Sequence, residues 1–585
     1  MDRREFLRAT ATSFVGMGLR GGLLTTAACT GDAAYAIAHN AAAATVFCNQ
    51  IGYLPLHAKQ ATVTTRARSF TVQRLADSSV VFRGSLSAPR PDPASGDGIQ
   101  IADFSSLKDP GQYRLLCDTG DPSLPFPIGA TVYQDALRAT MRAFYGQRCG
   151  CAVDLGGGYA HPVCHLDAAY HPSSGKKGPI KNHGGWHDAG DYGRYVVNSG
   201  LSTGTLLWAW ELYAPALRSL SLQIPESGGP VPEYLAEVRW NLAWMQTLQD
   251  KDGGLWHKQT SEKFCGFVMP QNDPAISYVI GTGSRPYKST CATADFAAVM
   301  AIAARCYGPY APDFARQCLL AARKAWAWCQ RHPDVTFQNP PGISTGAYSD
   351  KDCTNAMQWA AAELWRTTGE SAFQQAFLQL TGLAGQRLPS VSLQPPSWNN
   401  VYSMACWSYA LAMEHAPDAA TEAIRSATAQ AAAGLLQQAA QNGYGNSLAI
   451  EDYIWGSNGV ACNHSMLLLV AHHFQPSTTL VDAALANLHY LLGRNCLGIS
   501  WVTQLGVTPY QHPHHRPSIA DAIAAPWPGL LSGGPNARPA DKVAILLPRK
   551  PPMRMYIDND QAYSMNEVAI NWNAPLVFLL AAACS

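Results

Sequence analysis

The sequence predicts a mainly α-helical protein preceded by a small all-β sandwich. Residues 45–130 contain short runs of alternating apolar and polar side chains, such as QATVTT, separated by Pro, Gly and Asp. From residue 131 onward, apolar side chains recur at helical spacing, and long loops rich in Gly, Pro, Trp and His lie between these segments. We therefore expect a sandwich over 45–130 and a helical domain over 131–585.

The helical segments are similar in length and carry Ala on their apolar faces, which favours closely packed helical hairpins. The clearest ones span residues 133–149, 293–308, 311–332, 354–370, 421–440 and 479–495. Long polar and aromatic loops in such a fold usually carry function. No low-complexity linker separates the sandwich from the helices, so we expect the two domains to pack directly.

Composition excludes some classes of function. The chain has 42 Lys and Arg against 41 Asp and Glu and no basic stripe, so nothing favours a nucleic-acid partner. Its 16 cysteines are scattered, and many lie in helical patterns, as Cys306, Cys318 and Cys329 do. Buried free thiols are therefore expected rather than a disulfide framework.

Residues 1–30 resemble a twin-arginine (Tat-type) export signal. Arg3 and Arg4 precede Glu5-Phe6-Leu7, a weakly apolar run and the sequence TTAAC. Cys29 is a candidate for lipid attachment, although Thr26 fits the usual pattern for lipid attachment poorly. Alternatively, cleavage after the small residues frees the chain without a lipid. A basic, unstructured N-terminus that is no export signal is the remaining interpretation. We expect export to the periplasm or the exterior, with a membrane-anchored lipoprotein as one form.

Two stretches place carboxyl groups where acid–base chemistry is feasible. HGGWHDAGDYGRY, residues 183–195, carries Asp188 and Asp191, which could hold one water between them if the loop enters a helical turn. Glu567 precedes an apolar run among aromatic and amide side chains, where desolvation would raise its pKa and keep it protonated. For the two aspartates, the alternative interpretation is an N-cap Asp beside a solvated Asp. For Glu567, it is a surface Glu at a helix start.

A third stretch, PYQHPHHRPS at 509–518, concentrates imidazole and guanidinium groups in a Pro-rich loop. Its members are His512, His514, His515 and Arg516. The spacing does not match a usual zinc site, so hydrogen bonding to a ligand is the favoured interpretation.

Together these three stretches resemble glycoside hydrolase family 9, the family of inverting cellulases, and the resemblance extends over most of 45–585. NQIGYLP and ADFSSLKDPGQYRL resemble the immunoglobulin-like domain of one bacterial branch. The resemblance implies an (α/α)6 barrel with its active site in a groove at one end. It also implies that Asp191 is the general base, that Asp188 helps to hold the attacking water, and that Glu567 is the general acid.

The same resemblance implies substrate-binding residues. His514 and Arg516 match the family's P-H-x-R motif, and Tyr563 is expected to line the cleavage site. Candidate sugar platforms, each with a core aromatic as the alternative, are Trp256, Tyr453 and Trp455.

Metal sites follow from the resemblance as well. Some relatives bind structural zinc through positions that correspond here to Cys149, Cys164, His165 and His187, a closed tetrahedral set. Cys151 could compete as a ligand, and buried thiols beside a solvated His are the alternative. At the family's usual calcium site the carboxylates are replaced by Asn355-Ala356 and Asn399, so we expect no calcium there.

We therefore expect an inverting hydrolase of β-1,4-glucosidic bonds in cellulose or related β-glucans, endo-acting and monomeric. The alternatives are an exo-acting enzyme that releases glucose, cellobiose or glucosamine, and a catalytically inactive glycan-binding protein. A zinc hydrolase is disfavoured, since the four candidate ligands leave no open position for water.

Overall fold

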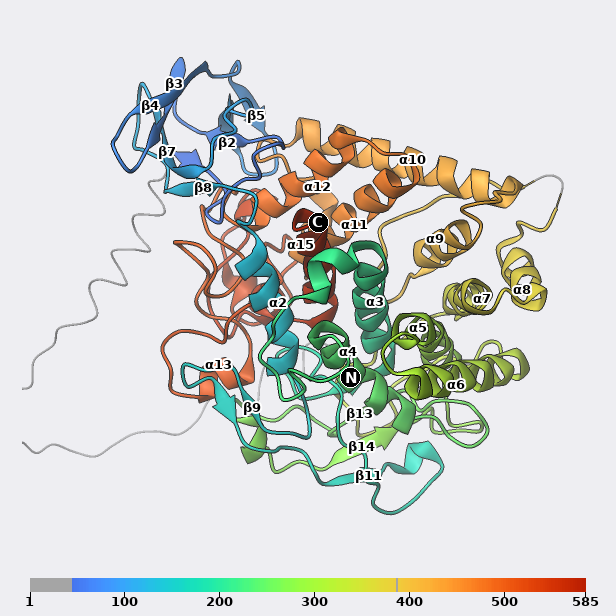
Figure 1. The fold of residues 1–585 in the computed structure, drawn as a ribbon. Coiled ribbons are helices and arrows are strands. Elements are labelled where there is room, and N and C mark those ends of the chain that lie inside the picture. The colour runs from blue at the N-terminus through green and yellow to red at the C-terminus, as the bar shows by residue number, and fades with distance from the viewer. Residues whose placement is uncertain (1–44, 386–387) are drawn as a thin grey trace, which may run out of the picture. The chain divides into compact units, whose positions relative to one another are not determined.

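The computed structural model describes residues 45–385 and 388–585 (Figure 1). The predictions for the export signal at residues 1–30 and for Cys29 lie outside these residues. Within the described ranges, no helix combines the length and the apolar character needed to cross a membrane.

The N-terminal domain is an antiparallel sandwich of two four-stranded sheets, ordered β1-β2-β6-β5 and β4-β3-β7-β8. The strands are β1 (Val46–Phe47), β2 (Gln60–Val63), β3 (Ser69–Arg74), β4 (Val80–Ser85), β5 (Arg90–Asp92), β6 (Asp97–Asp103), β7 (Gly111–Cys117) and β8 (Phe126–Ile128). Their inward-facing side chains share one core, in which the Tyr53 ring meets Phe104 and Phe126 edge-on at 5.3 and 5.4 Å.

The C-terminal domain is an (α/α)6 barrel. Its long helices are α2 (Gln134–Gly146), α3 (Val196–Arg218), α4 (Glu233–Thr247), α5 (Thr290–Tyr307), α6 (Pro312–Arg331), α7 (Thr354–Thr368), α8 (Ser371–Thr381), α9 (Tyr402–Ala412), α10 (Ala419–Gln441), α11 (Ser457–Phe474), α12 (Thr478–Leu491) and α15 (Ile570–Ala583). In the inner ring, α11 packs on α15, α15 on α3, and α3, α5, α7 and α9 follow in order. Small residues permit this closeness, since α5 buries six Ala along its length.

The inner helices begin where long loops end, and these loops gather at one end of the barrel. A mixed four-stranded sheet braces them, with strands β11 (Ala168–Tyr170), β14 (Ser277–Ile280), β13 (Lys258–Thr260) and β12 (Arg194–Tyr195) in that order. The short helices α13 (Arg516–Ala520) and α14 (Tyr563–Asn566) also lie within loops, as does the hairpin β9 (Val153–Asp154) with β10 (Ala160–His161). Catalytic candidates from distant parts of the chain therefore reach one place.

The sandwich packs directly against the barrel, as expected from the absence of a linker. Asp97 accepts hydrogen bonds from Arg554 and from the Tyr444 hydroxyl, at 2.7 Å each. Asp92 accepts the backbone N–H of Gly443 at 2.8 Å. Buried polar contacts of this kind fix the two domains in one arrangement.

Most cysteines conform to the prediction of free thiols. Cys306, Cys318 and Cys329 are buried and unpaired. Cys291 and Cys353, however, form a disulfide, and for these two residues the prediction was wrong. They start two adjacent inner helices, α5 and α7, and the 62 residues between them conceal this proximity in the sequence.

A buried charge network joins α3, α5 and α7 inside the ring. Glu363 is fully buried and accepts hydrogen bonds from Arg305, from Ser408 and from the indole N–H groups of Trp208 and Trp359. Glu211 also pairs with Arg305, at 2.9 Å. Both oxygens of the Glu363 carboxylate thus accept hydrogen bonds, as a buried charge requires.

Glu363→Ala should lower the free energy of unfolding by about 3–5 kcal/mol, because four donors inside the barrel lose their shared acceptor. Chemical denaturation followed by tryptophan fluorescence measures this change. The matched control is Glu370→Ala, which removes an exposed carboxylate paired with Arg323 and should leave stability near that of the wild type. Equal effects of the two substitutions would contradict the importance of the buried network.

Candidate active site

The loop that carries Asp188 and Asp191 is a tight turn, and not the helical turn that the sequence suggested. The Asp188 N–H donates to the Gly193 carbonyl at 2.9 Å, and the Asp188 carbonyl accepts from Ile570 at the start of α15. A Cβ on Gly190 would lie 1.9 Å from the carbonyl oxygen of His514, so only glycine fits at that position. The turn is thereby fastened to both the helix start and the His514 loop.

Asp188 is buried with both carboxylate oxygens occupied. The Asn198 amide donates to Oδ1 at 2.7 Å, and the Tyr348 hydroxyl donates to Oδ2 at 2.6 Å. Burial, with a smaller contribution from Asp191, raises the pKa of Asp188. The side chain is oriented by two strong donors on opposite sides.

Asp191 uses one oxygen for support and leaves the other without a protein donor. Its Oδ2 accepts the Gly193 N–H at 2.9 Å and the Tyr195 hydroxyl at 3.1 Å. The side chain is 8% exposed. A carboxylate held on one side and open on the other can accept a proton from a water.

Glu567 lies between α14 and α15, with its backbone held on both sides. Gly533 donates to its carbonyl at 2.8 Å, and His514 forms a parallel bridge with it. The side chain is partly exposed, but the surrounding protein removes water from its carboxyl group. This desolvation, followed by the charges of Asp191 and Asp188, raises the pKa of Glu567 well above its usual value. The interpretation of Glu567 as a surface Glu at a helix start therefore fails, and the interpretation as a desolvated carboxyl group holds.

Of the residues predicted to bind substrate, His514, Tyr563 and Trp455 lie together beside Glu567. The Tyr563 ring lies 5.3 Å from that of Trp455 and 5.7 Å from that of His514. Trp455 is 42% exposed, a suitable platform for a sugar ring. His514 donates from Nδ1 to the Asp560 carbonyl, which leaves Nε2 available.

Two of the predicted sugar platforms are wrong. Trp256 is 2% exposed and donates its indole N–H to the Ser174 carbonyl, and Tyr453 is completely buried. Both are core aromatics, because a ring without an accessible face cannot stack on a sugar.

Arg516 faces the protein rather than an open groove. It is 6% exposed and donates to the Gly190 carbonyl at 2.6 Å and to the Cys265 carbonyl at 2.9 Å. These contacts hold the loop of Asp191 from behind, so the guanidinium supports the site. His515 is also structural, since its ring bonds to Gln147 and Ser518.

Sequence reasoning missed the side chains that orient the carboxylates. Tyr348, Tyr195 and Asn198 each donate to Asp188 or Asp191, yet the sequence analysis gave none of them a role, although Tyr195 ends the motif at residues 183–195. Tyr195 and Asn198 lie within a few residues of Asp191 and could have been found from that spacing. Tyr348 comes from a loop 160 residues away, and no local pattern marks it.

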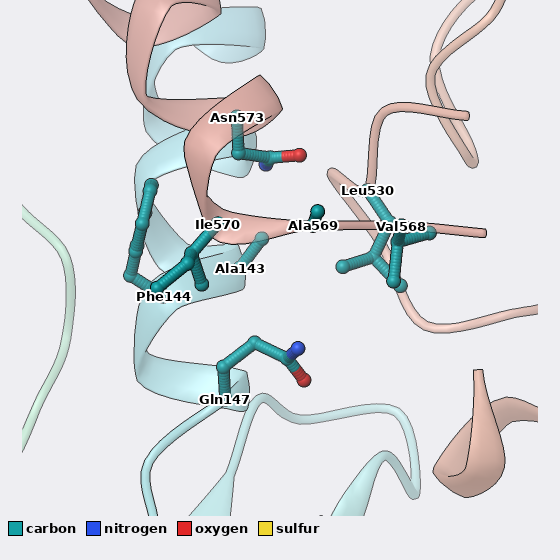
Figure 2. A pocket seen from close by; sticks show the side chains of 8 residues that line it. All are labelled: Ala143, Phe144, Gln147, Leu530, Val568, Ala569, Ile570 and Asn573. Atoms are coloured by element: carbon teal, nitrogen blue, oxygen red, sulfur yellow. The ribbon is translucent and has the colours of Figure 1, made fainter. Parts of the chain in front are cut away.

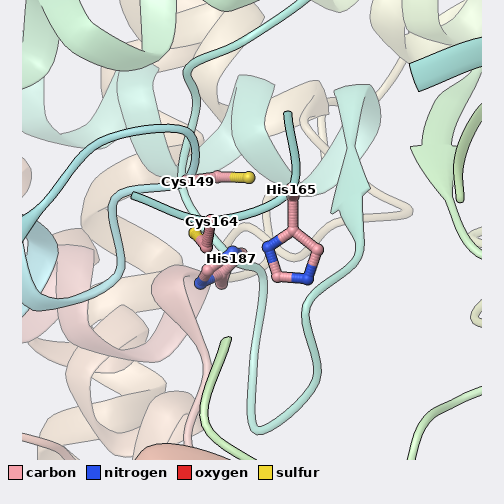
Figure 3. Close-up of side chains that lie close together, drawn as sticks. All are labelled: Cys149, Cys164, His165 and His187. Atoms are coloured by element: carbon pink, nitrogen blue, oxygen red, sulfur yellow. The ribbon is translucent and has the colours of Figure 1, made fainter. Parts of the chain in front are cut away.

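The four predicted metal ligands come together. The donor atoms of Cys149, Cys164, His165 and His187 all lie within 4.8 Å of one another, between loops that precede α3 (Figure 3). The next residue after His187 is Asp188, so this cluster borders the carboxylates directly. Cys151 is not part of this set.

The chemistry of the cluster fits a metal ion. Nδ1 of His165 and Nε2 of His187 are buried and have no hydrogen-bond partner, as metal-facing nitrogens would. The opposite nitrogen of His165 lies 3.3 Å from Asp273, the outer carboxylate that orients many metal-binding imidazoles. His165 also adopts a positive φ of 51°, a strained conformation that turns its ring toward the cluster.

The positions of the family's calcium site are occupied by amide contacts. Asn355 Oδ1 accepts the backbone N–H of Val401 at 3.0 Å, and Asn399 Oδ1 accepts the Ser397 hydroxyl at 2.7 Å. These neutral groups connect α7 to the following loop without the carboxylates that a hard cation prefers.

Behind the catalytic loop lies one small apolar cavity of about 10 Å³ between α2 and the start of α15 (Figure 2). Phe144, Ile570 and Val568 are among its lining side chains. The volume suffices for about one water and excludes a sugar. It is a packing gap and no substrate site.

Comparison with known proteins agrees with this geometry. Residues 133–580 match the family model described as glycosyl hydrolase family 9, and residues 41–121 match that of the cellulase N-terminal Ig-like domain. Endoglucanase D of Acetivibrio thermocellus is 34% identical over 543 residues, which cover 91% of this chain and 82% of that protein. A cellodextrinase of Butyrivibrio fibrisolvens is 32% identical over 550 residues, with 92% and 98% covered.

A solved structure, a zinc-binding triple mutant of the GH family 9 endoglucanase J30, matches with a TM-score of 0.84 and 34% identity. The match covers 91% of this chain and 99% of that one. The barrel, the Ig-like sandwich and the family model thus agree over most of the sequence, and the chain belongs to glycosyl hydrolase family 9.

Proposed function

We propose that this chain is an endo-acting β-1,4-glucanase that hydrolyses cellulose or related β-glucans with inversion at the anomeric carbon. The observation that carries the proposal is the set of three carboxyl groups at one end of the barrel, with Glu567 desolvated and Asp191 open on one side. The names of the similar endoglucanases support the substrate class.

In this proposal Glu567 protonates the glycosidic oxygen as the bond breaks, because its raised pKa keeps the proton available near neutral pH. Asp191 takes a proton from the attacking water through the oxygen that has no protein donor. Asp188, held by Asn198 and Tyr348, orients that water. Trp455 and Tyr563 stack on sugar rings beside the acid, and Nε2 of His514 accepts a hydrogen bond from a sugar hydroxyl.

Exo-acting cleavage on the same fold is the second candidate. It is favoured by the similar cellodextrinase, whose name indicates short substrates. An inactive glycan-binding protein is disfavoured, since both acid and base candidates are present and oriented.

We further propose that the Cys2His2 cluster holds a structural zinc ion. Its two thiols and two imidazoles suit tetrahedral zinc, and the zinc-binding J30 variant gives a precedent within the fold. With all four positions taken by protein, the ion would stabilise the loop before Asp188 and leave catalysis to the carboxyl groups. Export of the folded, zinc-loaded enzyme by the Tat route, with lipid attachment at Cys29 as one variant, completes the proposal.

The product profile tests the substrate and the mode of action. An endo-acting enzyme should cause a rapid fall in the viscosity of carboxymethyl-cellulose and release mixed oligomers from barley β-glucan. Slow release of one small sugar at nearly constant viscosity would establish the exo-acting alternative. Proton NMR of fresh digests should show the α-anomer first, and an initial β-anomer would exclude inversion.

Glu567→Gln and Asp191→Asn should each reduce kcat by about 10²- to 10⁴-fold, since each removes a proton-transfer group. Steady-state kinetics on β-glucan measure the effect. Glu422→Gln, on the outer helix α10, is the control and should keep full activity. Near-normal turnover by either active-site variant would remove the role assigned to that residue.

Glu567→Gln should also be at least as stable as the wild type at neutral pH. Because the pKa of Glu567 is raised by folding, the wild type loses stability as pH rises from the ordinary carboxyl pKa, about 4, toward the raised value. Glutamine does not ionise and avoids this loss. Thermal melts at several pH values should show the difference vanish below about pH 4; a variant less stable at every pH would contradict the desolvation argument.

Metal analysis of the purified protein should find about one zinc ion per chain, as a closed four-ligand site holds. Cys164→Ser should abolish this zinc and lower the melting temperature, because the ion's binding energy contributes to folding. Cys151→Ser is the matched control, a neighbouring thiol outside the set, and should retain zinc. A metal-free wild type with undiminished stability would refute the zinc site.

A further inference from the structure

The loop that delivers Tyr348 to Asp188 is held by a buried lysine. Residues 345–353 connect the base of the site to α7, and the disulfide at Cys353 anchors one end of this loop. The other end, at Thr345 and Gly346, lies over strand β13, from which Lys258 projects.

Lys258 is completely buried and bonds only to neutral oxygens. Its Nζ donates to Gly346 O at 2.6 Å, to Asn339 Oδ1 at 2.7 Å and to Thr345 Oγ1 at 3.1 Å, with Thr345 O at 3.3 Å. The rings of Tyr195 and Phe337 lie 5.5 and 5.7 Å from the ammonium group. A buried charge is costly, so these contacts indicate a specific use for it.

The residue just before the strand extends the same contact. His257 Nε2 lies 2.9 Å from the Ala347 carbonyl, which can only accept, so this nitrogen carries the proton and Nδ1 accepts from Ser289. Two adjacent side chains at the start of β13 therefore hold the carbonyls of Thr345, Gly346 and Ala347 in succession.

The next residue is Tyr348, which has a positive φ of 46°. A non-glycine residue holds this conformation only where its surroundings impose it. The imposed turn sends the Tyr348 hydroxyl to Asp188 at 2.6 Å and its ring to within 4.9 Å of Tyr195, which donates to Asp191. The lysine contacts thus lead to both catalytic aspartates.

We propose that Lys258 is a positioning residue of the active site: its ammonium group holds the loop that orients Asp188 through Tyr348. This inference rests on the proposed function, since the aspartates act there as base and water holder.

The lysine also interacts electrostatically with the site. Burial lowers the pKa of Lys258 to about 7, and the attraction of Asp191 opposes that fall.

Lys258→Met tests the inference, because methionine keeps the length and the apolar stem without the charge. We expect kcat on β-glucan to fall by about 10- to 100-fold with KM changed by less than about threefold. This split between kcat and KM is expected because the substitution removes the contacts that hold the loop, and not contacts with substrate. An unchanged kcat would overturn the proposal.

Lys288→Met is the matched control. Lys288 is also a buried lysine beside an aromatic ring, but it pairs with Asp250 at 2.8 Å and does not touch the loop. Its substitution should lower the melting temperature and leave kcat near that of the wild type. An equal fall of kcat in this variant would show that the loss of any buried lysine has the effect, which contradicts a specific role for Lys258.

Lys258→Arg carries the test if Lys258→Met does not fold. A guanidinium group keeps the charge but cannot reproduce the short contacts, so kcat should fall in this variant as well. A wild-type kcat would contradict the positioning role. A double-mutant cycle with Tyr348→Phe adds a second test: if Lys258 acts through Tyr348, the two losses in kcat are less than additive, and full additivity would refute that route.

Failure of the inference can be told apart from failure of the proposed function. A wild-type protein without glucanase activity would refute the function itself. A wild-type enzyme that is active, with Lys258→Met indistinguishable from it in kcat, would refute only the role of Lys258.

Discussion

The candidate active site depends on the burial of three carboxyl groups that the fold brings together. Burial and the charges of Asp191 and Asp188 raise the pKa of Glu567, and burial with Asp191 raises that of Asp188. Desolvation is the larger cause for both groups, and it makes the site costly to fold. The surrounding network of hydrogen-bond donors offsets that cost.

The offset comes from supports that approach the aspartates from different directions. Arg516 holds the turn from behind through the Gly190 carbonyl, Gln147 at the end of α2 donates to the Ala189 carbonyl, and the Cys2His2 cluster ends at His187, next to Asp188. Tyr348 and Asn198 donate hydrogen bonds to the Asp188 carboxylate itself. A metal ion in the cluster would make the backbone of this turn rigid at its N-terminal side, which explains why a structural site lies beside the catalytic carboxylates.

Local patterns in the sequence sufficed for the helices, the two domains and the carboxyl groups, since each shows itself in periodicity or in a short motif. The four candidate metal ligands followed from the family resemblance. They did not suffice for burial of single aromatics: Trp256 and Tyr453 stand in loop sequences that look exposed, yet both are core residues. The disulfide between Cys291 and Cys353 and the contact of Tyr348 with Asp188 join segments far apart in the chain. Such pairs depend on how the inner helices neighbour one another, which no local pattern records.

The position of Lys258 shows why this distinction matters for function. In the sequence it is one lysine in a polar run, and an exposed strand lysine would be the ordinary expectation. In the fold it is the cation that bridges the strand of Tyr195 and the loop of Tyr348, so its ammonium group touches the supports of both aspartates. A charge buried at that point costs stability unless polar groups surround it. The four oxygens that accept from the ammonium group meet this requirement, so the lysine and the loop that carries Tyr348 depend on each other.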